Sequence, residues 1–222
     1  MFKEKFDLNL DFLKMKSPHL IGVDISSSSV KMVELSMSNK GNQTYRIERY
    51  AIEPLPDDAM LEGGIVNLEV VSDCMQRGWK RMGTRRKNVA LALPVTDVIT
   101  KKIIVPAGQR EDDLIFQVEN EASQYIPFPL DEIDLDFQIV KPVSDGADEV
   151  EVLIAASRKE KVEDRVAAAL SAGLKAIVMD VESYAAQAAF ELTLSQLPEG
   201  GKNQVIALVD IGSTVMKINV FH

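Results

Sequence analysis

Alternating apolar and polar residues predict strands near the start of the chain. Leu20–Ile25 is a short apolar run that ends in the serines Ser26–Ser29, and Val30–Leu35 and Tyr45–Ile52 then alternate. A period of two is typical of strands that bury one face. This part of the sequence therefore predicts a strand, a tight turn and two further strands.

Helical spacing replaces the alternation farther along the chain. Asn67 is a suitable helix cap, and Gly83 is a suitable terminator for a helix that ends at Met82. The apolar face that we expect this helix to bury consists of Leu68, Val71, Met75 and Trp79. Asn88–Leu93 follows as an apolar strand. Three strands, a helix and a strand predict an α/β fold in which helices cover a mixed sheet.

The middle of the chain predicts a β-α-β-β-α unit inserted into this fold. Its expected parts are a strand at Val98–Val105, a helix at Arg110–Tyr125, strands at Leu135–Val140 and Val150–Ala155 around a turn at Ser144–Gly146, and a helix that ends at Gly173. Ser157 and Glu160 form a capping-box pattern at the start of that helix. Its expected apolar face is Val162, Val166, Ala169 and Leu170.

The last part of the chain returns to the first pattern. Ala176–Val181 predicts a strand, Glu182–Leu197 predicts an alanine-rich helix, and Val205–Val209 starts a new strand after a glycine-containing loop. The first fold therefore resumes after the inserted unit.

One short motif occurs twice. Val23–Lys31 aligns with Val209–Lys217, and the copies share valine, aspartate, isoleucine, one serine and a lysine seven positions after the aspartate. Each copy lies at a predicted strand-turn-strand junction, which suggests duplicated halves. A turn of small residues lets backbone N–H groups approach a phosphate, and Mg²⁺ prefers carboxylate oxygens, often through water. Two such turns could clamp an oligophosphate, although each pattern alone also fits an ordinary hairpin.

Four segments carry a resemblance to a known family. Ile21–Lys31 resembles the first phosphate loop of the actin-like ATPases. Glu119–Leu130, Leu153–Glu160 and Val178–Tyr184 narrow the resemblance to the PilM-like proteins of type IV pilus assembly. The resemblance covers residues 18–222 and implies an actin-like fold: a ribonuclease-H-like mixed sheet flanked by helices, with an FtsA-type inserted subdomain.

The same resemblance implies a domain organisation. Residues 18–94 and 173–200 would form subdomain 1A, residues 95–172 the inserted subdomain 1C, and residues 201–222 the start of a second domain. Residues 1–17 would form an N-terminal tail, which is either a flexible tail or a small docking helix, with binding to a membrane surface as the alternative. Because the chain stops soon after the second copy of the motif, we expect a C-terminally truncated form of a longer protein, with low affinity for ATP by itself.

The site residues follow from the resemblance in the same way. Asp24, Ser26, Ser27, Ser28 and Ser29 would lie at the first phosphate loop, where Lys31 contacts phosphate. The second phosphate loop would consist of Asp210, Gly212, Ser213 and Thr214. Asp24 and Asp210 would hold Mg²⁺, and Glu182 would orient the catalytic water. The second loop has one glycine where many relatives have two or three, so close approach of its backbone to phosphate is less secure.

The implied function is that of a cytoplasmic scaffold at the inner face of the inner membrane. Such proteins bind ATP and the short cytoplasmic N-terminus of PilN, which lies in a groove between subdomains 1A and 1C. We expect binding rather than turnover, contacts with other assembly-platform proteins, and self-association. The alternatives are an FtsA-like filament-forming ATPase and a cytoplasmic interaction domain of a type II secretion component.

Composition and charge exclude some classes of function and leave others open. The net charge of −9 argues against a general nucleic-acid binder, and no apolar run is long enough to span a membrane. Six bases between Arg77 and Lys87 fit either a helix C-terminus or contact with acidic lipid or an acidic neighbour. Nine acids between Arg110 and Asp136 fit either a solvated face or assembly with that basic run. Cys74, the one cysteine, is expected to have no metal role, and the isolated His19 and His222 are too few for a zinc site.

Overall fold

The computed structural model describes residues 20–38, 44–143, 148–201 and 204–221, so the predicted tail and the turn at Ser144–Gly146 lie outside the described residues. The chain divides into a large unit, His19–Val95 with Glu163–His222, and a small unit, Thr96–Val162. The first part of the large unit ends at Val95, close to residue 94, where the first part of subdomain 1A was expected to end. The large unit resumes before the expected residue 173, and it includes the C-terminal hairpin.

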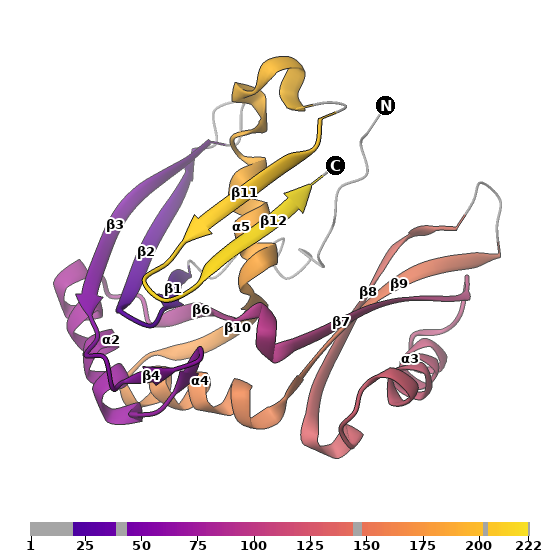
Figure 1. Ribbon diagram of the computed structural model, residues 1–222, viewed down its shortest axis with the longest axis horizontal. Coiled ribbons are helices and arrows are strands. Elements are labelled where there is room, and N and C mark those ends of the chain that lie inside the picture. The colour runs from indigo at the N-terminus through magenta and orange to yellow at the C-terminus, as the bar shows by residue number, and fades with distance from the viewer. Residues whose placement is uncertain (1–19, 39–43, 144–147, 202–203, 222) are drawn as a thin grey trace. The chain divides into compact units, whose positions relative to one another are not determined.

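A five-stranded mixed sheet forms the centre of the large unit (Figure 1). In sheet order its strands are β10 (Lys175–Val181), β6 (Asn88–Leu93), β1 (Ile21–Ile25), β2 (Ser29–Ser38) and β3 (Thr44–Pro54). β1, β2 and β3 are antiparallel neighbours, whereas β1, β6 and β10 are parallel to one another. Ile21, Val30 and Val89 are fully buried. The predicted strands and the predicted α/β fold class are confirmed.

Helix α2 (Leu68–Met82) has the predicted ends. The Asn67 side chain accepts a hydrogen bond from the Val70 N–H at 3.2 Å. Gly83 adopts the left-handed conformation, with φ of 63°, that glycine tolerates best. Val71 and Met75 are fully buried as expected. The exposed Leu68 was wrongly placed on the buried face, because it lies in the first turn at the edge of the core.

Helix α4 (Lys159–Ser171) differs from the sequence prediction. Ser157 lies in β9 (Glu149–Arg158), and its hydroxyl donates to the Asp97 carbonyl at 2.8 Å, so the predicted capping box is wrong. The expected apolar face is also wrong in part: Ala169 is buried but Val166 and Leu170 are exposed. The buried Arg165 donates to the Gly63 carbonyl at 2.9 Å, which explains how a charged residue can lie on the buried face.

Three arginines of the basic run near the end of α2 form ion pairs with carboxylates of the large unit. Arg77 and Arg81 pair with Glu53, and Arg86 pairs with Glu34. Both glutamates are buried and need such partners. These contacts favour the structural explanation of the basic run over contact with lipid or a neighbouring chain.

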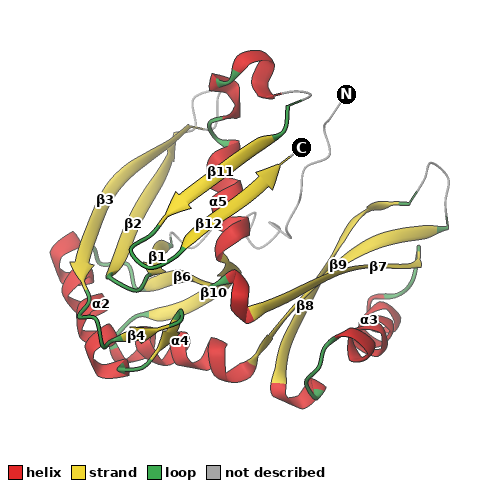
Figure 2. Ribbon diagram, viewed as in Figure 1, coloured by secondary structure: helices red, strands yellow, loops and turns green. Residues whose placement is uncertain are grey.

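The small unit is a three-stranded antiparallel sheet with a helix packed on it (Figure 2). Its parts are β7 (Val98–Pro106), β9, β8 (Ile133–Pro142) and α3 (Glu111–Tyr125). Val118 of α3 and Val152 of β9 are fully buried in its core. The strands and the helix follow the predicted order of the inserted unit.

The chain ends in a helix and a hairpin that belong to the large unit. Helix α5 (Glu182–Glu191) ends earlier than predicted, where the Thr193 hydroxyl and N–H both donate to the Phe190 carbonyl. Strands β11 (Ile206–Ile211) and β12 (Met216–Phe221) form a separate antiparallel pair. Within the described part of the chain, no helix has both the length and the apolar character needed to cross a bilayer.

Candidate functional site

The two copies of the sequence motif form the same local structure. We call Ser26–Ser29 the first bend and Gly212–Val215 the second bend. The Ser26 N–H donates to the Ser29 carbonyl at 3.0 Å, and the Gly212 N–H donates to the Val215 carbonyl at 3.0 Å. In both hairpins the motif aspartate lies opposite the motif lysine in the strand register. The repeat in the sequence is therefore a repeat in the backbone.

The large unit brings these bends into contact. The Ser27 hydroxyl lies 2.8 Å from the Ser213 hydroxyl and 3.0 Å from the Thr214 hydroxyl. Figure 1 shows the turn of the yellow β11–β12 hairpin at the bend between β1 and β2. Residues that are 186 and 187 positions apart in the sequence thus form one cluster of hydroxyl groups.

The two motif lysines have different partners. Lys31 donates from Nζ to Asp24 Oδ2 at 2.8 Å, and both side chains are 49% exposed. Lys217 lies opposite Asp210 in the strand register, but its Nζ pairs with Glu182 Oε2. Glu182 is the first residue of α5, where the helix dipole favours a carboxylate. The second hairpin is therefore joined to the helix that contains the predicted water-orienting residue.

The four serines of the first bend are not equivalent. The Ser26 hydroxyl donates to the Ser29 carbonyl at 2.9 Å, and Ser29 is buried. The Ser28 carbonyl accepts a hydrogen bond from the Leu55 N–H, whereas its side chain is exposed. Ser26 and Ser29 thus shape the bend, and the hydroxyls of Ser27 and Ser28 are more accessible to a ligand.

Glycine is required at the start of the second bend. A Cβ atom on Gly212 would lie 2.8 Å from the Val215 carbonyl oxygen, which is closer than real Cβ contacts allow. The small number of glycines in this loop is thus less limiting than it looks in the sequence, because the one glycine occupies the tight position.

Asp180, at the end of β10, is a candidate that the sequence prediction did not include. It pairs in register with Ala92, and β1 pairs with β6 through Gly22 and Ala90. Continuing this register places Asp24 and Asp180 at one level of the sheet and on the same face. Burial raises the pKa of Asp180 above its ordinary value, although the Val181 N–H donates to its carboxylate at 2.7 Å. Its signal in the sequence is an acid near the end of an apolar strand.

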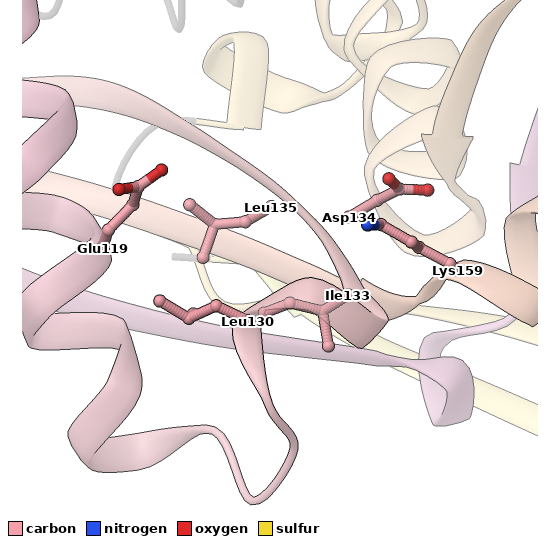
Figure 3. A pocket seen from close by; sticks show the side chains of 6 residues that line it. All are labelled: Glu119, Leu130, Ile133, Asp134, Leu135 and Lys159. Atoms are coloured by element: carbon pink, nitrogen blue, oxygen red, sulfur yellow. The ribbon is translucent and has the colours of Figure 1, made fainter.

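The small unit contains a pocket, and none of the predicted site residues is among those that line it (Figure 3). It has a volume of about 310 Å³, and its lining consists of Glu119, Leu130, Ile133, Asp134, Leu135 and Lys159. Lys159 donates to the Asp131 carbonyl at 2.7 Å. Within the residues that the structure describes, no three histidine, cysteine, aspartate or glutamate side chains are arranged to hold a metal ion.

Known proteins resemble this chain in sequence and in fold. A family model described as type IV pilus assembly protein PilM matches residues 22–222. A solved structure, the PilM-PilN type IV pilus biogenesis complex, aligns with a TM-score of 0.76 and 28% identity over 91% of this chain and 57% of that chain. The chain therefore spans little more than half the length of this relative.

A second solved structure is more distant. It is the cytoplasmic domain of EpsL, an inner membrane component of the type II secretion system of Vibrio cholerae, with a TM-score of 0.45 and 10% identity over 75% of this chain and 58% of that chain. This likeness is too weak to support the secretion alternative. The PilM match spans nearly the whole sequence, as the resemblance predicted, and the chain therefore belongs to the type IV pilus assembly protein PilM family.

Proposed function

We propose that this chain contains the phosphate-binding part of a scaffold protein of type IV pilus assembly. The observation that carries the proposal is the contact of Ser27 with Ser213 and Thr214, which joins the first and second bends in one place. Membership of the PilM family supports the same function. We place the protein in the cytoplasm at the inner face of the inner membrane, which it would reach through its partners.

The residues of the bends suit an oligophosphate. Hydroxyls and backbone N–H groups of small residues donate hydrogen bonds to phosphate oxygens, and Gly212 keeps its bend tight. Lys31 adds a positive charge beside the first bend. Asp24 and Asp210 would hold Mg²⁺ through water, since magnesium keeps several of its own waters and needs few protein ligands. When bound, the ion would neutralise phosphate charge.

We infer that binding of ATP matters more than its hydrolysis. Glu182 would orient a water if hydrolysis occurs, but its carboxylate is paired with the Lys217 ammonium. A carboxylate engaged with a cation is a weaker hydrogen-bond acceptor for water. Turnover should therefore be slow.

The proposed partner is the N-terminal cytoplasmic peptide of PilN. The aligned structure is a complex of PilM with PilN, and at 28% identity it supports a shared partner. We expect an extended or short helical apolar peptide to bind in a groove between the predicted subdomains 1A and 1C. Other assembly-platform proteins and further copies of the chain are expected neighbours.

Two titrations of the full chain test this function. A fluorescent ATP analogue with Mg²⁺ should bind with low affinity, and Asp24→Asn and Asp210→Asn should each weaken its binding about tenfold or more, as loss of a charged contact would. Asp113→Asn on α3 is the matched control, since Asp113 is exposed and lies in the small unit. A labelled PilN N-terminal peptide should bind as well.

The outcomes separate the alternatives. Peptide binding with negligible ATP turnover supports the scaffold. ATP turnover without peptide binding would favour the FtsA-like ATPase, and equal nucleotide affinity of all three variants and the parent chain would contradict the proposed site.

A further inference from the structure

The proposed function assigns Lys217 no contact with the nucleotide, yet the contact of Lys217 with Glu182 is the main difference between the two motif copies. Lys31 and Lys217 occupy the same position of the repeat, opposite Asp24 and Asp210 respectively. Lys31 pairs with the aspartate of its own hairpin, whereas Lys217 pairs with Glu182 on α5. The second lysine thus forms a long-range contact where the first forms a local one.

The β11–β12 hairpin needs such a contact. It is a separate two-stranded sheet, and an isolated pair of this kind is marginally stable in water. Large apolar side chains on the hairpin and its turn are exposed, namely Val209, Ile211, Val215, Met216, Ile218 and Val220. Ile206 and Leu208 are only partly buried, so burial of apolar side chains holds these strands less firmly than it holds the strands of the five-stranded sheet.

Polar contacts are what join the end of this hairpin to the rest of the large unit. One is the hydroxyl cluster of Ser27 with Ser213 and Thr214, which is exposed to water and so individually weak. The other is the pair of Lys217 with Glu182, whose side chains are 36% and 16% exposed. A charged hydrogen bond that is partly shielded from water is stronger than a neutral bond at the surface.

We propose that Lys217 is a positioning residue: through Glu182 it holds the second bend against the first. The assignment of the two bends as one phosphate site rests on the proposed function, whereas the contact between hairpin and helix does not. Lys217 also keeps the Glu182 carboxylate occupied, which ties the position of the second bend to the group that would orient water.

Hydrogen exchange of the β11 and β12 amides in the full chain tests this role without any ligand. Lys217→Met and Glu182→Gln should each raise exchange about three- to tenfold, the range expected for a partly buried ion pair. Because the two groups act together, the double variant should exchange no faster than either single variant. Lys217→Arg keeps the charge and should stay close to the parent chain.

Lys31→Met is the matched control. It removes the equivalent lysine of the other copy, and it should leave exchange in β11 and β12 unchanged, because the Lys31 ammonium pairs with Asp24 of its own hairpin. Unchanged exchange of the β1 and β6 amides shows that each variant still folds.

Three results would overturn the proposal: a Lys217→Met variant that exchanges like the parent chain, additive effects of the two substitutions, or hairpin amides that are unprotected in the parent chain. Binding of a Mg²⁺-ATP analogue is a separate readout. If the parent chain binds no nucleotide but the exchange results hold, the proposed function fails and the role of Lys217 stands.

Discussion

The first and second bends lie in two copies of one sequence motif and have the same backbone hydrogen bond, but their surroundings differ. Ile25, next to the first bend, is 4% exposed, whereas its counterpart Ile211 is 79% exposed. The first bend joins two strands of a five-stranded sheet covered by α2, and the second joins the two strands of a separate two-stranded sheet.

This difference shows what a short motif can encode. Small residues between two strands specify a tight bend wherever they occur. The position of that bend in the molecule is set by its surroundings: burial in the sheet for the first copy, and side-chain contacts of Ser213, Thr214 and Lys217 for the second.

The largest expected effect comes from the matched isoleucines. Ile25→Ala should lower the free energy of unfolding by about 2–5 kcal/mol, because it leaves a cavity in the core. Ile211→Ala should change it by no more than about 0.5 kcal/mol. Chemical denaturation measures both. Similar losses for the two variants would mean that the second hairpin is as well buried as the first.

The next effect concerns the first position of each bend. Gly212→Ala should cost about 1–3 kcal/mol in the local stability of the second hairpin, because the new methyl group meets the Val215 carbonyl. Ser26→Ala removes only the hydroxyl bond to Ser29 and should cost about 0.5–1.5 kcal/mol. Hydrogen exchange at the two bends would show the difference. A second hairpin unaffected by the alanine would argue against the tight closure of this bend.

A smaller effect on stability should come from Asp180, near the end of β10. The pKa of Asp180 is raised by burial, so the folded state binds this proton more tightly than the unfolded state does. Stability should therefore fall as the pH rises from the ordinary value of 3.8 through the raised pKa. Asp180→Asn should be more stable than the parent chain at pH 7, and the difference should disappear in acid.

Asp24→Asn provides the comparison, because Asp24 is half exposed and paired with Lys31. Thermal unfolding as a function of pH measures both variants. A stability gain for Asp24→Asn equal to that for Asp180→Asn would contradict the burial argument.

The smallest expected effect on stability comes from the exposed Glu48 in β3, a strand of the same sheet as the first bend. Hydrogen bonds from Arg46 and Ser36 lower its pKa to about 2. This pairing stabilises the fold above the ordinary value of 4.5, and the contribution is lost as the pH falls toward 2. In Arg46→Met the pKa of Glu48 should rise toward its ordinary value, and NMR titration measures this rise. Added salt should also raise the pKa of Glu48, because it screens the pair. A parent chain in which Glu48 titrates near 4.5 would contradict this.

Local signals explain why much of the fold could be predicted from the sequence. The strands around the first bend follow from alternation, and the ends of α2 follow from Asn67 and Gly83. Helix α4 was harder to predict, because Ser157 bonds to Asp97 and Arg165 bonds to Gly63, both far away in the sequence. A hydrogen-bond partner that lies on another helix, strand or loop cannot be recognised from the local sequence pattern.

The same distinction applies to the candidate site. The repeat identified both bends, and the structure brings Ser27 of the first into contact with Ser213 and Thr214 of the second. The pairing of Lys217 with Glu182 and the burial of Asp180 depend on the placement of α5 and on the order of the strands. Neither can be deduced from the spacing of the residues.

The central claim is that the two bends form one phosphate site, and NMR of the isotope-labelled chain tests it most directly. As a Mg²⁺-ATP analogue is added, the backbone amide signals of Ser27 and of Ser213 should shift together with a single dissociation constant, and Asp210→Asn should weaken both responses equally. Shifts at only one bend, or two different dissociation constants, would contradict the claim.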